Sequence, residues 1–168
     1  MGRKFQVASI FDSMTIGDCL KMVRFSHKTP SLIQAHTEIS LPAPAADILE
    51  LTGMAEMIDK PVSLLSHGQR YALELAMVVA LQPRVILLDE PKAGLTKTEL
   101  MTIGIILKKL TDEMGFAEIL VEHDLDFVRE ISSRIVVLHH GKLVLDGTVE
   151  EVVNSETVRT VYSGGAHG

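Results

Sequence analysis

The sequence predicts an α/β fold with a helical first half and a largely parallel sheet in the second half. Two short apolar runs, Val85–Leu88 and Glu118–Val121, are typical of strands that are buried on both faces. A helical pattern over Thr98–Met114 separates the two runs, and this strand–helix–strand order favours a parallel arrangement. No clear strand is predicted before residue 82.

Length and composition indicate a soluble chain with an aliphatic core. The 168 residues suggest one domain or slightly more, and 46% of them are hydrophobic but only 4% aromatic. Cys19 is the single cysteine, which excludes an internal disulfide. The net charge of −6 argues against nucleic acid as a partner. No apolar run approaches the roughly 18 residues that a membrane span needs.

The remaining elements follow from apolar spacing and turn residues. In the first half, apolar side chains at helical spacing predict helices over Ile16–Phe25, Asp47–Ile58 and Gln69–Leu81. The second half is predicted to continue with a helix, a hairpin of two strands and a short helix: Leu125–Ser132, Arg134–His139 with Lys142–Leu145, and Val149–Val153.

A first candidate site is the acidic pair that follows the run Val85–Leu88. A buried strand ending in Asp89 and Glu90 would deliver both carboxylates to the carboxyl edge of the sheet, where α/β proteins bind ligands. Asp89 there could hold Mg²⁺, and Glu90 could accept a proton from an attacking water. Alternatively, the pair simply marks a strand end before the turn at Pro91.

A second candidate is the segment Leu65–Gln69, directly before a predicted helix. Ser66 is a favourable N-cap, and a helix N-terminus presents free N–H groups to an anion. Gly68 would permit close backbone approach to that anion. The alternative is an ordinary turn capped by serine.

A third candidate is His123, which follows the run Glu118–Val121. A neutral histidine at the carboxyl end of a strand can donate a hydrogen bond to a phosphate oxygen and orient a water. A capping or core-edge role is the alternative for His123. The same role is the interpretation for five other histidines: His27, His36, His139, His140 and His167.

Together the three motifs are more specific than any one. They follow at intervals of 21 residues, from Gly68 to Asp89, and 33 residues, from Glu90 to His123. This order resembles the C-terminal portion of an ABC-type ATPase subunit. Leu65–Gln69 is similar to the signature motif, Val85–Glu90 to the Walker B strand, His123 to the switch histidine and Ala93–Thr96 to the D-loop.

The resemblance extends from Gly2 to about Tyr162. Gly2–Gln6 is similar to the Q-loop segment, with Gln6 as its glutamine. Within the family, the chain is most similar to importer ATPases for branched-chain amino acids and urea. That similarity rests on His67, on the D-loop and on the closing segments Asp146–Thr148 and Val158–Tyr162.

The family resemblance implies a role for each motif. Two subunits of this family sandwich two ATP molecules, so the stretch Ser66–Gln69, with His67 inside it, would bind ATP held by the opposite subunit. Asp89 would support Mg²⁺, Glu90 would activate water, and Gln6 would sense the metal and that water. His123 would be the second catalytic residue.

The implied fold is a partial P-loop NTPase (RecA-like) core of the ABC type with an α-helical subdomain. Residues 1–81 would hold the Q-loop segment, the helical subdomain and the signature motif, and residues 82–162 the C-terminal part of the core. Residues 163–168 would be a flexible tail. The helical subdomain would dock on membrane-spanning permease subunits and the core on a second ATPase subunit. The chain would then be cytoplasmic, at the inner face of the cell membrane.

One element of the family is not found. A phosphate-binding loop reads G-x-x-x-x-G-K-[ST], and the only Gly-Lys pair, Gly141-Lys142, does not match it. The resemblance implies that the P-loop strand and the N-terminal antiparallel sheet are missing. That strand would lie between the strands before His123 and around Val136, so either these two strands close up, another chain fills the gap, or the chain folds poorly. We expect negligible ATP hydrolysis by this chain alone.

These observations favour the energising subunit of an ABC importer for small solutes, such as branched-chain amino acids or urea. The alternative is a pseudo-ATPase, a binding or regulatory module of the same fold that works without nucleotide. An ABC-type ATPase of DNA repair is less favoured, because no zinc or coiled-coil insertion is found. The departures from the general pattern are His67, in place of a glycine, and Thr96, in place of the usual D-loop aspartate.

Overall fold

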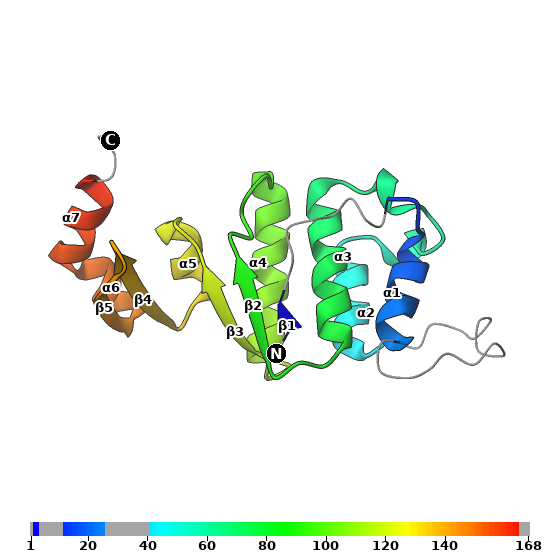
Figure 1. Ribbon diagram of the computed structural model, residues 1–168, viewed down its shortest axis with the longest axis horizontal. Helices are drawn as coiled ribbons and strands as arrows, with labels where there is room; N and C mark the ends of the chain where they lie inside the picture. Colours follow the sequence, from blue (N-terminus) through cyan, green and yellow to red (C-terminus); the bar gives the residue numbers. More distant parts are fainter. Residues whose placement is uncertain (1, 4–11, 26–40, 165–168) are drawn as a thin grey trace. The chain divides into compact units, whose positions relative to one another are not determined.

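The computed structural model describes residues 2–3, 12–25 and 41–164 (Figure 1). Its contacts divide the chain into two compact units, Met1–Glu122 and His123–Gly168. The boundary expected from the sequence, between residues 81 and 82, falls inside the first unit. No helix in the described ranges is long and apolar enough to cross a membrane.

The sheet of the first unit is parallel, as the sequence predicts. Its strands are β1 (Gly2–Arg3), β2 (Val85–Asp89) and β3 (Ala117–Val121), in the order β1-β2-β3. The register aligns Asp89 with Val121, so β2 and β3 end at the same edge. The two-residue strand β1 was not expected, because so short a segment carries no periodic pattern.

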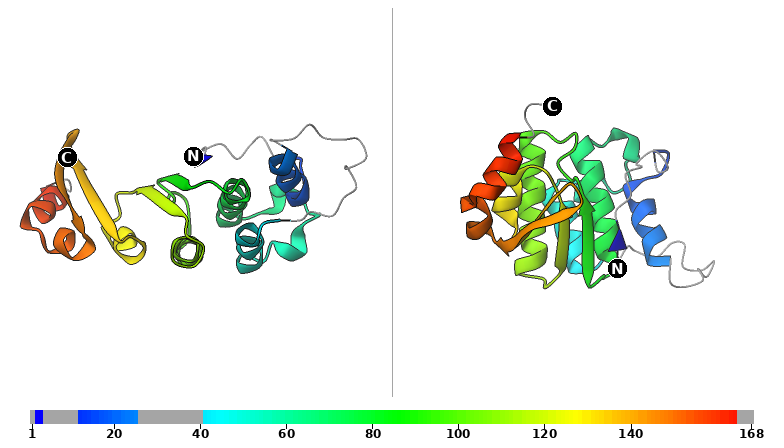
Figure 2. Two further views of the ribbon diagram at one scale, coloured as in Figure 1. Left: turned by 90° about the horizontal axis from the view of Figure 1, so that it is seen from below. Right: turned by 60° about the vertical axis from the view of Figure 1, so that its left-hand side comes forward.

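Four α-helices accompany this sheet, and their bounds are α1 (Ile16–Phe25), α2 (Ala43–Leu51), α3 (His67–Ala80) and α4 (Lys97–Asp112). Helix α3 packs against α1, α2 and α4. Figure 2 shows α4 along one face of β2 and β3. On one face of this sheet the side chains of Ile86 and Leu88 are buried. On the other face Ile119 is 55% exposed and Val121 59% exposed.

The helix predicted over Asp47–Ile58 is wrong in its bounds. Helix α2 begins at Ala43 and ends at Leu51, and the chain continues in two short 3-10 turns, η3 (Ala55–Met57) and η4 (Val62–Leu64). Gly53 causes the break, since its φ of 69° lies in the left-handed region, which a helix interior does not accommodate. The apolar spacing continues through this break, so the pattern does not reveal it.

The second unit contains the predicted hairpin and its helices. Their bounds are α5 (Leu125–Ile131), β4 (Arg134–His139), β5 (Lys142–Thr148), α6 (Val149–Asn154) and α7 (Glu156–Gly164). Strands β4 and β5 are antiparallel, and a small core forms around Ile135, Val137, Val152 and Val158. Helix α7 was not predicted, and residues 165–168 lie outside the described ranges.

Strands β3 and β4 belong to separate sheets. Among the described residues β3 pairs with β2 alone, and β4 pairs with β5 alone.

Candidate functional site

The predicted cap at Ser66 is confirmed. The Ser66 side chain accepts a hydrogen bond from the Gln69 backbone N–H at 3.2 Å, and the Gln69 side-chain oxygen accepts one from the Ser66 N–H at 3.2 Å. This reciprocal capping box satisfies two of the free N–H groups at a helix start. Helix α3 therefore begins at His67, two residues earlier than the predicted Gln69.

A carboxylate from another helix also reaches the start of α3. The Ser66 hydroxyl donates to Glu99 Oε1 at 2.7 Å, and the Gly68 backbone N–H donates to the same oxygen at 3.0 Å. The second oxygen, Oε2, accepts from the backbone N–H and the hydroxyl of Thr96, at 3.0 and 2.9 Å. Glu99 thus joins the N-termini of α3 and α4 with one side chain.

These hydrogen bonds stabilise the charged form of Glu99. Its pKa is lowered to about 2, first by the Thr96 backbone N–H and then by the Ser66 hydroxyl. The sequence analysis did not single out Glu99. The spacing Thr96-x-x-Glu99 is a capping-box pattern, and this signal would have identified its role on α4 but not its contact with Ser66.

Gly68 lies against the side chain of Glu99, whereas the sequence analysis expected a bound anion beside it. A Cβ atom at this position would lie 2.5 Å from Cγ of Glu99, closer than real Cβ contacts. The absence of a side chain at Gly68 therefore makes room for Glu99 in this structure.

His67 makes a further contact, which joins the signature segment (Ser66–Gln69) to the D-loop (Ala93–Thr96). Its Nε2 atom lies 3.2 Å from the carbonyl oxygen of Ala93, which accepts a hydrogen bond when Nε2 carries the proton. A Cβ atom at Gly94, whose φ is 77°, would lie 3.0 Å from the same nitrogen. The structure thus brings Ser66–Gln69 together with the D-loop and the start of α4.

The acidic pair lies where the sequence predicts, at the carboxyl end of β2. Asp89 and Glu90 are both exposed. Glu90 has a φ of 44°, in the left-handed region, and its backbone N–H donates to the Val121 carbonyl at 2.9 Å. A non-glycine residue in this conformation costs about 1–3 kcal/mol, so β3 holds a strained turn in place. The backbone N–H of Lys92 donates to the Glu122 carboxylate at 3.1 Å and fixes the turn from the other side.

The remaining predicted residues are placed less completely. His123 is the first residue of the second unit, and its side chain is exposed. Asp124, its neighbour, caps α5 by accepting from the Phe127 N–H at 3.0 Å. Gln6 lies outside the described residues. The roles assigned to His123 and Gln6 therefore stay predictions.

Asp89 and Glu90 fit only part of a magnesium–nucleotide site. Within the described residues no group of three or more metal-binding side chains converges. Mg²⁺ is commonly held by one or two carboxylates together with phosphate oxygens and water, which suits this exposed pair. The phosphate-cradling loop has no counterpart in the 168 residues, so the chain offers carboxylates and signature residues without a cradle.

A pocket of about 160 Å³ lies beside the start of α3. Ser66, Gly68 and Gln69 line it from α3, and Glu99 and Thr102 line it from α4. The hydrogen-bond donors of the signature segment therefore border an accessible space, and Glu99 lines the same space.

Sequence reasoning also missed Glu118, which lies on the buried face of β3 beside Ile86. One of its carboxylate oxygens is buried without a hydrogen-bond partner. Burial, followed by the charge of Asp112, raises the pKa of Glu118 to about 8. No sequence pattern signalled it, because a lone glutamate in a short strand is usually solvent-facing.

Comparisons with known proteins agree with these motifs. Residues 2–93 match the family described as ABC transporter. The high-affinity branched-chain amino acid transport ATP-binding proteins BraF of Pseudomonas aeruginosa and LivG of Escherichia coli are each 32% identical to this chain. Each alignment covers 98% of this chain and 68% of the relative.

Solved structures show the same fold. The ADP conformation of an ATP-binding cassette of an ABC transporter superposes with a TM-score of 0.76 at 23% identity, over 97% of this chain and 68% of that one. The structure of cbiO1 from Clostridium perfringens, part of the ABC transporter complex cbiONQ, superposes with a TM-score of 0.74 at 27% identity. That superposition covers 94% of this chain and 60% of cbiO1.

Proposed function

Because this chain belongs to the family of ABC transporter ATP-binding proteins, we propose that it supplies signature and Walker B residues to an importer of small solutes. The relatives' names support branched-chain amino acids as the solute class, and urea or similar small solutes remain part of the proposal through the family resemblance. The observation that carries the proposal is the capped start of α3, where Ser66, Gly68 and Gln69 lie together beside a pocket.

In this proposal the segment Ser66–Gln69 faces the γ-phosphate of an ATP held by a second ATPase subunit. The backbone N–H groups and the positive end of α3 are suited to that contact. Asp89 would hold Mg²⁺, which supplies neutralisation of phosphate charge when bound. Glu90 would accept the proton of the attacking water, and His123 and Gln6 would orient the reacting groups.

The chain alone is proposed to hydrolyse almost no ATP. Phosphoryl transfer depends on positioning and on charge neutralisation by a phosphate loop, and the 168 residues contain no such motif. The same observation favours the second candidate function, a pseudo-ATPase that acts as a binding or regulatory module. The two differ in whether an added P-loop segment generates turnover.

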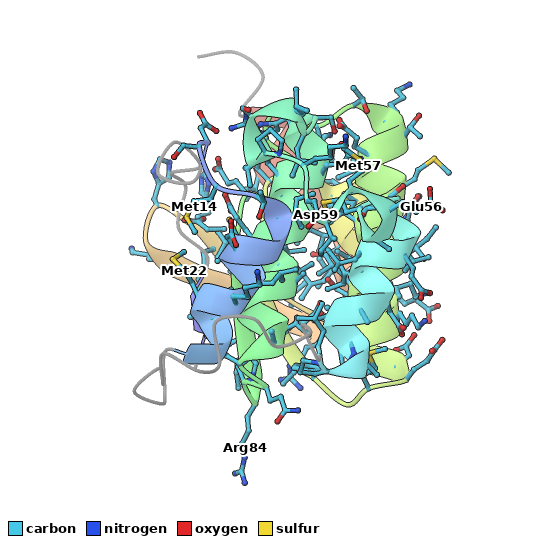
Figure 3. The ribbon with its side chains drawn as sticks, turned by 90° about the vertical axis from the view of Figure 1, so that its right-hand side faces the viewer. Met14, Met22, Glu56, Met57, Asp59 and Arg84 are labelled. Atoms are coloured by element: carbon cyan, nitrogen blue, oxygen red, sulfur yellow. The ribbon has the colours of Figure 1, made fainter. Side chains whose placement is uncertain are left out.

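The helical part of the first unit is proposed to dock on a membrane-spanning permease subunit at the inner face of the cell membrane. Figure 3 shows Met22 on α1 and Met14 just before the helix, and Met22 is 41% exposed. The Gly17 N–H donates to the Ile58 carbonyl at 2.8 Å, so α1 and the segment after η3 form one surface. Flexible methionine side chains adapt well to a partner's apolar groups.

A reconstitution experiment tests the function. The purified chain is assayed for Mg²⁺-dependent ATP hydrolysis alone and after addition of a separate segment that carries the motif G-x-x-x-x-G-K-[ST]. We expect turnover only in the mixture, with loss of about 100-fold or more in Glu90→Gln and Ser66→Ala. Ser63→Ala is the matched control, since Ser63 is also exposed and its carbonyl, which the substitution keeps, accepts a hydrogen bond from Arg70.

Two outcomes contradict the proposal. Turnover by the chain alone that Glu90→Gln abolishes would disprove the need for an added loop. Absence of ATP binding and turnover in the mixture would favour the pseudo-ATPase instead.

A further inference from the structure

We propose that the Glu99 carboxylate is an internal anion that occupies the hydrogen-bond donors of the signature segment, so that a phosphate reaching these donors must displace it. The inference rests on the proposed function for the identity of the incoming group, a nucleotide phosphate. It adds a residue outside the signature motif that controls access to that motif.

The two donors concerned are already committed. The Ser66 hydroxyl has one proton and donates it to Glu99 Oε1 at 2.7 Å, while its oxygen accepts from the Gln69 N–H. The Gly68 N–H has one proton and donates it to the same oxygen at 3.0 Å. A hydroxyl and an amide each donate a single hydrogen bond, so neither is available to a second acceptor.

The position is shaped for a carboxylate. Only a glycine at position 68 leaves room for Glu99, since a Cβ atom there would lie 2.5 to 2.7 Å from three of its side-chain carbons. The carboxylate also lies at the positive end of α3, a helix of 14 residues, where a negative charge is stabilised. Four donors hold it, and the low pKa of Glu99 keeps it ionised at neutral pH.

The two oxygens of Glu99 accept hydrogen bonds from different helices, so the contact with α3 can be broken while the contact with α4 remains. Oε1 binds Ser66 and Gly68 of α3, whereas Oε2 binds Thr96 at the start of α4. Displacement from α3 breaks the two bonds to Oε1 and leaves the capping box of α4 intact. An incoming phosphate would therefore release the signature segment from Glu99 of α4 without unfolding either helix.

Titration with inorganic phosphate tests the inference on the whole chain. Amide NMR signals of Gly68 and Gln69 report binding in the wild type, Glu99→Gln and Glu99→Ala. We expect the dissociation constant for phosphate to fall about tenfold in both variants, the effect of removing one charge-assisted contact. Without phosphate, hydrogen exchange of the Gly68 amide should be faster in Glu99→Ala.

Glu151→Gln is the matched control. Glu151 closes the same type of capping box, with its carboxylate accepting from the backbone N–H and hydroxyl of Thr148 at 2.8 and 3.0 Å. This variant removes an equivalent helix cap in the second unit, so it should bind phosphate like the wild type. A thermal unfolding curve verifies that each variant is folded. If the Glu99→Ala variant is unfolded, the phosphate affinity of Glu99→Gln decides the result.

Equal phosphate affinity in the wild type and the Glu99 variants would overturn the inference, and so would absence of any phosphate effect on Gly68 in all of them. The titration needs neither a second subunit nor ATP turnover. Failure of the proposed function would instead appear as turnover unaffected by Ser66→Ala in the reconstituted mixture, with the phosphate result unchanged.

Discussion

The imidazole of His67 approaches the backbone of Ala93, with 3.2 Å between Nε2 and the carbonyl oxygen. The general signature motif has a glycine where this chain has His67, so the contact is a product of this departure. It fixes the start of α3 to the D-loop across 26 residues of sequence.

Replacing His67 with alanine should loosen this attachment. We expect a loss of about 0.5–1 kcal/mol in the free energy of unfolding, since the hydrogen bond is exposed. Exchange of the Leu95 amide, which donates to the Lys92 carbonyl within the D-loop turn, should become faster. His139→Ala, on the exposed hairpin, is the control and should leave both measurements unchanged.

Gly68→Ala should destabilise the chain by about 1–3 kcal/mol, because the new Cβ atom overlaps Glu99. The same substitution in a Glu99→Gly background should cost far less, since the overlapping atoms are gone and alanine is the better helix former. Urea unfolding of the four chains measures the coupling. Equal costs in the two backgrounds would show that Gly68 is needed for another reason.

The stability of the first unit should fall as the pH rises from about 4.5 to about 8, because the pKa of Glu118 is raised to about 8 by burial. The proton held in the folded state stabilises it below the unfolded pKa, and that contribution is lost as the folded carboxyl ionises. Glu118→Val should abolish this component and raise the free energy of unfolding at pH 8 by about 1–3 kcal/mol. Denaturant titrations across this pH range check both statements, and an unchanged slope in Glu118→Val would contradict them.

The exposed apolar face of β3 should cause self-association of the isolated chain. Sheets with an uncovered apolar face and an unpaired edge tend to pair with other chains. Ile119→Lys should lower the average mass measured by sedimentation. Ile105→Lys is the matched control, because Ile105 is 58% exposed on helix α4, whereas Ile119 is 55% exposed on a strand. An equal effect of both substitutions would indicate general solubilisation by charge.

The parts of the fold that the sequence predicted are those with a local cause. Val85–Leu88 forms a strand because a short apolar run suits a sheet interior, and Ser66 caps α3 through atoms three residues away. The end of α2 was not predicted, because apolar residues continue at helical spacing past Gly53, whereas the helix itself ends before this glycine.

The parts that the sequence could not reveal depend on distant partners. Glu99 meets Ser66 across 33 residues, and no local pattern reports that contact. Glu118 is buried through the packing of the sheet rather than through its neighbours in sequence. The roles of His123 and Gln6 rest on family resemblance and remain to be tested.

The left-handed backbone of Glu90 places the proposed catalytic carboxylate on a turn that glycine would form more easily. Glycine adopts a φ of 44° without strain, so Glu90→Gly would be expected to stabilise the turn while removing the carboxylate. Comparing Glu90→Gly with Glu90→Gln would therefore separate the backbone cost of the turn from the chemistry proposed for the carboxylate, because both variants lack the carboxylate and only the first relieves the backbone.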